Sequence, residues 1–172
     1  MPPVAGVGDD VAVAGGRRQV FTGRMPITGK YEPSSSEWVR DQVELYESSG
    51  GTEGTTLLDT GLPVVIITSR GVSSGNIRKT PLMRVEHDGV YALVASQGGA
   101  PTHPHWYANL RADPHIEIQD GPDRWDAVVR QVEGDERTQW WERAVAAYPP
   151  YAEYQERTER VIPVLVVERS DG

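Results

Sequence analysis

The chain has 172 residues, of which 38% are hydrophobic and 24% are charged, and this length and balance fit a single globular domain. It contains no cysteine, which excludes disulfides, zinc–thiolate sites and thiol nucleophiles. The formal net charge of −8 argues against binding to nucleic acid or to an anionic membrane surface, because both repel an acidic protein.

Residues 1–24 are rich in Gly, Ala and Val and show no helical or strand period, so we expect a disordered leader followed by one domain over residues 25–172. No apolar run approaches the roughly 18 residues that a membrane span needs, and no signal peptide is evident. We therefore expect a cytoplasmic protein without stable membrane insertion.

Ser34 and Glu37 have the spacing of a capping box, which predicts a helix that runs to about Ser48 and ends at Gly50-Gly51. β-branched runs, Gly-rich turns and the hairpin signal Asp88-Gly89 predict strands after that helix. The six expected strands cover residues 63–68, 78–85, 90–96, 115–119, 125–132 and 161–168. Two further helices are expected over residues 104–110 and 135–147.

Most of these strands follow one another as hairpins, and helices are inserted between them. The order differs from the strand–helix alternation of a parallel nucleotide-binding sheet. The sequence therefore predicts a mainly β, α+β fold: a six-stranded antiparallel barrel with helical insertions.

The segment from Thr68 to Val85 carries Arg70, Arg78, Lys79 and Arg84 and no acidic residue. On an otherwise acidic chain such a basic island is a candidate anion site. The same pattern also fits a solvated hairpin with scattered charge, and the residues alone leave the two interpretations open.

Two motif matches are rejected on context. Gly71-Val-Ser-Ser-Gly75 matches G-x-S-x-G, but the serine of a hydrolase elbow is followed by a helix, whereas Pro81 indicates a strand or turn. His103 and His105 flank a proline and lack the i, i+4 spacing of a helical metal pair, so no metal site is expected. Glycine-rich dinucleotide and ATP-binding motifs are absent from the sequence.

Tyrosines recur every three residues near the end of the chain, at Tyr148, Tyr151 and Tyr154. In a helix or 3₁₀ turn this spacing gathers the three rings on one side. They could form a core-facing stripe or a wall beside a ligand, because tyrosine combines a flat apolar face with a hydrogen-bond donor.

Three stretches in register are similar to the deazaflavin (coenzyme F420)-dependent nitroreductase family. They are SSGNIRKTPLMRVEHDG from Ser73, VASQGGAPTHPHWYANL from Val94, and WWERAVAAYPPYAEYQERTERVIPVLVVE from Trp140. The likeness extends from about Trp38 to Glu168. It implies a split β-barrel related to flavin-mononucleotide-binding reductases. It also implies a coenzyme with a phosphodiester-linked, anionic oligoglutamate tail.

By family position, the resemblance implies two sets of site residues. The coenzyme-binding set is Arg70, Ser73, Ser74, Gly75, Asn76, Arg78, Lys79, Thr80, Pro81, Leu82, Ser96, Gln97, Gly98, Gly99, His105, Trp106 and Asn109. The catalytic set is Tyr148, Tyr151, Tyr154 and Ser96, with Tyr148 as the expected donor to the substrate. Relatives commonly carry basic residues at Ser73 and Gln97 and a basic or polar one at Asn76, so this chain has fewer cations for the tail.

The resemblance therefore implies an enzyme that passes a hydride from reduced coenzyme F420 to a small electron-poor acceptor: a quinone, a nitro compound or an activated alkene. Two alternatives stay open. One is an oxidoreductase of the same fold that uses flavin mononucleotide (FMN), and the other is a non-catalytic deazaflavin-binding protein. A homodimer is compatible with either.

Overall fold

The computed structural model describes residues 27–57 and 60–170. The expected leader over residues 1–24 and the expected domain start at residue 25 lie outside the described residues. The strands are β1 Val64–Arg70, β2 Ile77–Met83, β3 Val85–His87, β4 Val90–Val94, β5 His115–Asp120, β6 Asp123–Gln131 and β7 Val164–Arg169. The helices are α2 Glu37–Ser48, η1 Gln97–Gly99, α3 His105–Ala112, α4 Gly134–Ala147 and α5 Pro150–Glu156.

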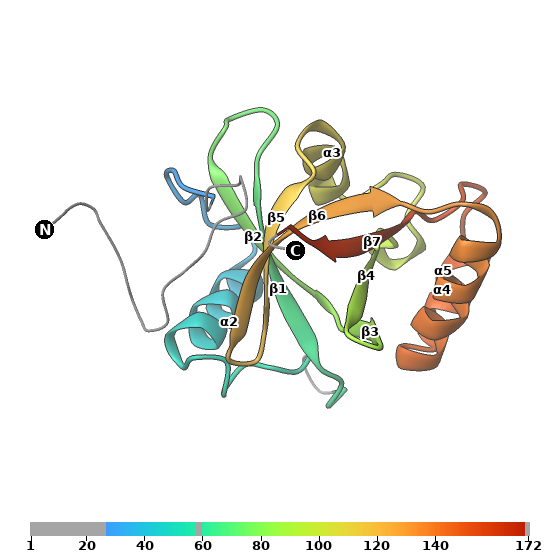
Figure 1. Ribbon diagram of the computed structural model, residues 1–172, viewed down its shortest axis with the longest axis horizontal. Helices are drawn as coiled ribbons and strands as arrows, with labels where there is room; N and C mark the ends of the chain where they lie inside the picture. Colours follow the sequence, from blue (N-terminus) through green and yellow to red (C-terminus); the bar gives the residue numbers. More distant parts are fainter. Residues whose placement is uncertain (1–26, 58–59, 171–172) are drawn as a thin grey trace, which may run out of the picture.

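The strands form one antiparallel sheet of seven strands in the order β2-β1-β5-β6-β7-β4-β3. The two strands at the ends of this order follow each other in the chain with only Arg84 between them. The sheet therefore curls back on itself into a barrel-like shape (Figure 1). The expected count of six was wrong, because the run 78–85 bends at Arg84 and pairs with β1 through β2 and with β4 through β3.

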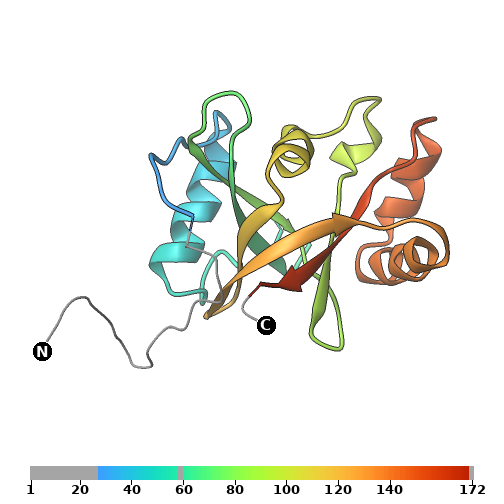
Figure 2. The ribbon, with the colours of Figure 1, turned by 45° about the horizontal axis from the view of Figure 1, so that its top comes forward.

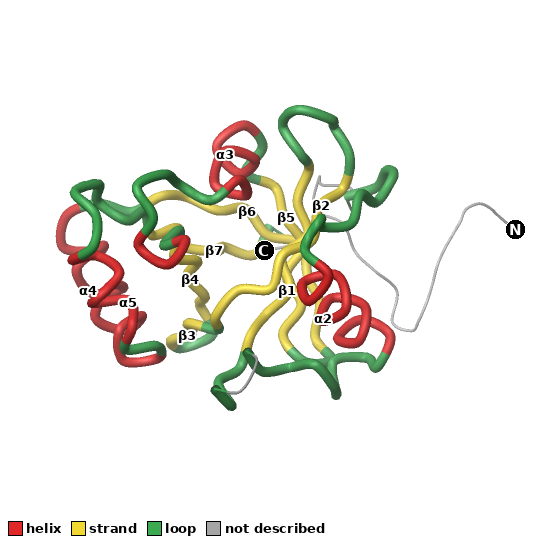
Figure 3. Tube along the Cα trace, turned by 180° about the vertical axis from the view of Figure 1, so that it is seen from behind, coloured by secondary structure: helices red, strands yellow, loops and turns green. Residues whose placement is uncertain are grey.

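The central strands are buried on both faces. Along β1, Val64 and Ile66 join one apolar cluster, while Val65 and Ile67 join another on the opposite face. Helices α2, α4 and α5 cover the first cluster, and α3 packs on the second. In Figures 1 and 3, α2 and the α4–α5 pair lie at opposite flanks of the sheet. Both faces need apolar residues, which explains the continuous β-branched runs in the sequence.

Helix α2 begins at Glu37, but the expected capping box does not form. The Ser34 hydroxyl oxygen accepts a hydrogen bond from the Ser36 amide at 3.0 Å, and Ser36 takes the cap position without a side-chain cap bond. The last strand also begins later than expected, at Val164 instead of Val161. Pro163 has no amide hydrogen to donate, although its carbonyl oxygen accepts from Ala95.

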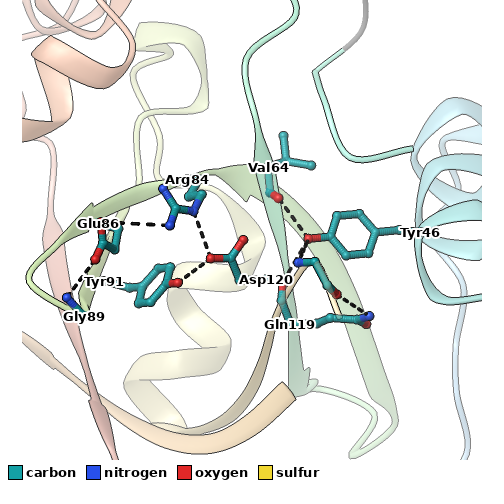
Figure 4. A network of polar contacts seen from close by, with 9 residues as sticks. Tyr46, Val64, Arg84, Glu86, Gly89, Tyr91, Gln119 and Asp120 are labelled. Carbon is teal, nitrogen blue, oxygen red and sulfur yellow. Dashed lines mark hydrogen bonds and ion pairs between the residues drawn. The ribbon is translucent and has the colours of Figure 1, made fainter. Parts of the chain in front are cut away.

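Two polar anchors inside the fold are shown in Figure 4. The buried Tyr46 hydroxyl bridges α2 to the sheet through Val64, Gln119 and Gly121. At the bend, Arg84 Nε donates to Asp120 Oδ2 at 2.9 Å, and the Tyr91 hydroxyl donates to the same carboxylate oxygen. The second anchor ties the bend between β2 and β3 to β5.

In the described part of the chain, no helix has the length and apolarity to cross a bilayer.

Candidate functional site

A cavity of about 650 Å³ opens at one end of the sheet. Figure 2 shows that the β1–β2 turn, α3, η1 and the turn after α5 gather at this end. The lining comes from four parts of the chain. The lining residues are Glu32, Pro33, Ser34, Ser35, Val39, Gly71, Val72, Ser73, Ser74, Arg78, Lys79, Thr80, Gln97, Pro104, His105, Trp106, Ala108 and Asn109.

The β1–β2 turn is fixed by its own backbone and by α3. Gly71 donates to the Asn76 carbonyl at 2.7 Å, and Gly75 donates to the Gly71 carbonyl at 2.9 Å. Gly75 has a φ of 75°, which favours glycine. The Val72 amide donates to Asn109 Oδ1 at 2.9 Å, so α3 holds the tip of the turn over the cavity.

The basic island is locally neutralised by acids from distant parts of the chain. Arg78 pairs with Glu32 at 3.2 Å, and Lys79 pairs with Glu47 at 2.7 Å. A further member, Arg70, lies 3.9 Å from the Asp113 carboxylate. Arg70 also donates to the backbone carbonyls of Gly75 and Thr28. An incoming anion would therefore compete with carboxylates for Arg78 and Lys79, whereas Arg70 stabilises the turn.

Glu32 is a cavity residue that the sequence analysis missed. It reaches the site because the segment before α2 pairs with the start of β2: Ile77 donates to Lys30, and Glu32 donates to Ile77. A hydrogen bond from Asn76 and the charge of Arg78 hold the pKa of Glu32 below its usual value, so this carboxyl is ionised at neutral pH. No local signal in residues 30–36 indicates this pairing.

The cavity is also lined by α3 and by the loop that contains η1. Gln97 lines the cavity and has a φ of 46°, in the left-handed region that non-glycine residues rarely adopt. Ser96 precedes it and is 9% exposed. Gly99 belongs to the expected coenzyme-binding set. A Cβ atom there would lie 2.7 Å from the Tyr154 carbonyl oxygen, because η1 packs directly on α5.

The three tyrosines meet as the spacing predicts. Their ring centroids lie 5.0–6.2 Å apart, although Tyr148 follows α4 and the other two lie on α5. The hydroxyls of Tyr148 and Tyr154 lie 3.1 Å apart. Tyr151 is 4% exposed and packs in the core with Trp140 and Ala144. The hydroxyl pair is therefore the polar part of this cluster, and Tyr151 is its apolar base.

The structure gathers about half of the expected coenzyme residues around the cavity. Those that line it are Ser73, Ser74, Arg78, Lys79, Thr80, Gln97, His105, Trp106 and Asn109. Those outside its lining are Arg70, Gly75, Asn76, Pro81, Leu82, Ser96, Gly98 and Gly99. Asn76 donates to Glu32 at 3.2 Å, and Leu82 packs against the sheet core. The roles of both sets stay predictions.

Comparison with known proteins places the chain among reductases. The family model described as F420H(2)-dependent quinone reductase matches residues 38–169. An F420H(2)-dependent quinone reductase of Mycobacterium tuberculosis is 34% identical over 110 residues, which cover 62% of this chain and 74% of that protein.

Two solved structures are more than 50% identical to the chain. One described as an F420-H2-dependent reductase (FDR-A) is 54% identical, with a TM-score of 0.59 over 62% of this chain and 94% of its own. A second, described as a domain-swapped dimer, is 51% identical, with a TM-score of 0.61 over 78% of this chain and 100% of its own.

Proposed function

This chain belongs to the F420H(2)-dependent quinone reductase family, and we propose that it reduces a quinone with coenzyme F420H2 bound in the cavity beside the β1–β2 turn. The resemblance noted in the sequence agrees with this family. The observation that carries the proposal is one cavity whose lining combines the cations Arg78 and Lys79 and serine hydroxyls with Gln97, His105 and Trp106. Nitro compounds and activated alkenes are alternative acceptors.

The donor set of the cavity fits an anionic, elongated ligand. Arg78 and Lys79 supply positive charge, and the hydroxyls of Ser73 and Ser74 in the adjoining turn supply neutral donors. Both cations already bind carboxylates, of Glu32 and Glu47, which indicates that their side chains can hold a negatively charged oxygen in this place. Trp106 adds an apolar ring to the same lining.

Each part of the site has a distinct task in this proposal. The coenzyme supplies, when bound, a hydride for an electron-poor acceptor. Arg78 and Lys79 bind the anionic tail, and Gln97 orients the ring. Hydride transfer places negative charge on a quinone oxygen, and a hydroxyl of the Tyr148–Tyr154 pair, which lies outside the cavity lining, donates a hydrogen bond to it. The proton that completes the hydroquinone comes from water.

The direct test of the proposal is equilibrium binding of two coenzymes. We expect the purified protein to bind coenzyme F420 more tightly than FMN in fluorescence titrations, and to oxidise F420H2 when a quinone is added. Tighter binding of FMN would support the flavin alternative. F420 binding without quinone reduction would indicate a coenzyme carrier.

Arg78→Ala is expected to weaken coenzyme binding about tenfold or more, because a hydrogen bond to a charged group contributes about 1.5–3 kcal/mol. Glu32 would add to the loss, since its carboxylate would remain beside the tail without its ion-pair partner and with only the neutral Asn76 amide donating to it. The matched control is Arg84→Ala on the same bent strand, which removes a contact with Asp120 outside the cavity.

We expect Arg84→Ala to lower the melting temperature and leave coenzyme affinity unchanged. Replacing Glu32 by Gln in the Arg78→Ala protein is expected to restore part of the affinity, because it removes the repelling charge. Equal losses of affinity in the two arginine variants would mean that the basic island attracts the coenzyme only through long-range electrostatics, without a direct contact from Arg78.

Three further proposals complete this assignment. The domain is a split β-barrel that extends from about residue 25 to residue 172, and the barrel-like antiparallel sheet supports it. The protein works in the cytoplasm. It forms a homodimer, which the 51%-identical structure described as a domain-swapped dimer supports.

A further inference from the structure

The loop Ala95–Ala100 is held in a conformation that its own sequence does not favour. Gln97 has a φ of 46°, a backbone conformation that is strained for a non-glycine residue. Such a conformation persists where surrounding contacts determine it. The same residue lines the proposed coenzyme cavity, so whatever fixes the loop also fixes part of the site.

The side chain of Arg160 makes three of those contacts, and Arg157 Nη1 adds one to the Gly98 carbonyl at 3.3 Å. Arg160 Nε donates to the Ala100 carbonyl at 2.9 Å, its Nη1 to the Ala95 carbonyl at 3.2 Å, and its Nη2 to the Ser96 carbonyl at 2.7 Å. One guanidinium thus binds both ends of a loop that is six residues long. A planar group with five fixed donors can do this, whereas a lysine ammonium is a compact point charge.

The backbone of Arg160 is itself anchored to α5. Gln155 Nε2 donates to the Arg160 carbonyl at 2.8 Å, and Gln155 Oε1 accepts from the Ile162 amide at 3.0 Å. The Ile162 side chain is fully buried. The helix that carries Tyr151 and Tyr154 is therefore joined through this turn to the loop that carries Ser96 and Gln97.

His103 completes the set of contacts. Its Nδ1 lies 2.8 Å from Arg160 Nη1, and its ring packs on Tyr107 with centroids 4.6 Å apart. Burial and the charges of Arg160 and Arg111 hold the pKa of His103 below its usual value. The imidazole is therefore neutral at neutral pH, and its Nδ1 accepts a hydrogen bond from the guanidinium.

We propose that Arg160 is a positioning residue of the coenzyme site. It holds the loop Ala95–Ala100, and this keeps Gln97 beside the coenzyme ring at a fixed position relative to the Tyr148–Tyr154 hydroxyl pair. The proposal rests on the proposed function for the identity of the ligand. The structural basis is independent of the ligand, because the three carbonyl contacts lie within the chain. The competing explanation is that Arg160 only stabilises the fold.

The test compares Arg160→Gln, Arg160→Lys and a matched control. Arg137→Gln is the control, because Arg137 is a half-buried arginine that donates to the Ile162 carbonyl of the same turn at 2.7 Å and does not bind the loop. Turnover is measured per coenzyme-binding site, which removes the effect of any unfolded fraction. Amide hydrogen exchange of residues 95–103 is measured on the protein without ligand.

We expect Arg160→Gln to lower turnover per site about tenfold or more, because small misplacement of reacting groups has effects of that size. Coenzyme affinity should change less than turnover, since Arg78 and Lys79 are untouched. Loop amides should exchange faster than in the wild type. Arg160→Lys should recover part of the turnover and part of the protection of the loop amides. Arg137→Gln should match the wild type in turnover and in amide exchange.

Unchanged exchange in the loop, or turnover per site equal to that of Arg137→Gln, would overturn the proposal. If Arg160→Gln does not fold, Arg160→Lys decides by the same two measurements. A wild-type protein that binds no F420 would instead contradict the proposed function, and the exchange measurement would still decide whether Arg160 fixes the loop.

Discussion

Replacing Tyr148 by phenylalanine is expected to lower the turnover of a quinone about 10²-fold, while coenzyme affinity and melting temperature stay near the wild-type values. The substitution keeps the aromatic ring and removes only the hydroxyl that lies 3.1 Å from the Tyr154 hydroxyl. Removing one preorganised donor to a developing oxyanion has an effect of about this size in other enzymes. Steady-state kinetics with F420H2 and thermal melts provide the two measurements.

The pH dependence follows from the state of the phenol. The hydrogen bond to Tyr154 and burial raise the pKa of Tyr148 to about 12. Because the donor is the protonated form, the hydroxyl can donate at every pH below that value. The ratio of wild-type to Tyr148→Phe turnover should therefore be constant between about pH 6 and about pH 10, whatever else titrates in the site.

The control for this prediction is Tyr151→Phe, which alters a ring that is buried in the core beside the pair. We expect its turnover to match the wild type. Tyr154→Phe should fall between the two, because it removes the partner of the Tyr148 hydroxyl without removing that hydroxyl. Wild-type turnover in all three variants would mean that the three tyrosines contribute only to packing of the core.

The largest effect on stability is expected at Tyr46. Its hydroxyl donates toward the carbonyls of Val64 and Gln119 and accepts from the Gly121 amide at 2.7 Å, all in a buried position (Figure 4). Tyr46→Phe leaves that amide without its acceptor, and an unsatisfied buried group costs about 1–3 kcal/mol. Tyr46→Ala also leaves a cavity and should reduce the free energy of unfolding by about 3–5 kcal/mol.

Urea unfolding followed by tryptophan fluorescence measures both changes. Tyr31→Phe is the matched control, because that ring is 38% exposed and its hydroxyl can be replaced at little cost. We expect the free energy of unfolding of this control to differ by less than about 0.5 kcal/mol from the wild type. A Tyr46→Phe protein as stable as Tyr31→Phe would show that the hydroxyl does not hold α2 to the sheet.

The sequence predicted most of the secondary structure because its signals are local. The β-branched runs, the Asp88-Gly89 hairpin and the tyrosine spacing each depend on neighbouring residues, and the structure contains the corresponding elements. The bend at Arg84 escaped prediction because its cause is not local. One continuous run of strand residues pairs with two different strands, and only the tertiary fold decides where the partner changes.

The candidate site was predicted less completely for the same reason. Residues that follow one another in the turn, such as Ser73 and Arg78, could be grouped from the sequence. The carboxylates of Glu32 and Glu47, which pair with Arg78 and Lys79, are 46 and 32 positions away in the chain. A short segment of sequence that contains one of these cations does not contain its acidic partner. From the sequence, the basic island therefore carried positive charge without nearby carboxylates.

The place of β7 in the sheet has a consequence for the order of folding. It is the last described strand in the chain, yet it pairs with β6 on one side and with β4 on the other. During synthesis, β4 and β6 emerge first and have open hydrogen-bonding edges until Val164–Arg169 has left the ribosome. Such edges pair readily with other chains. The nascent protein is therefore most exposed to aggregation in the interval between the synthesis of β6 and that of β7.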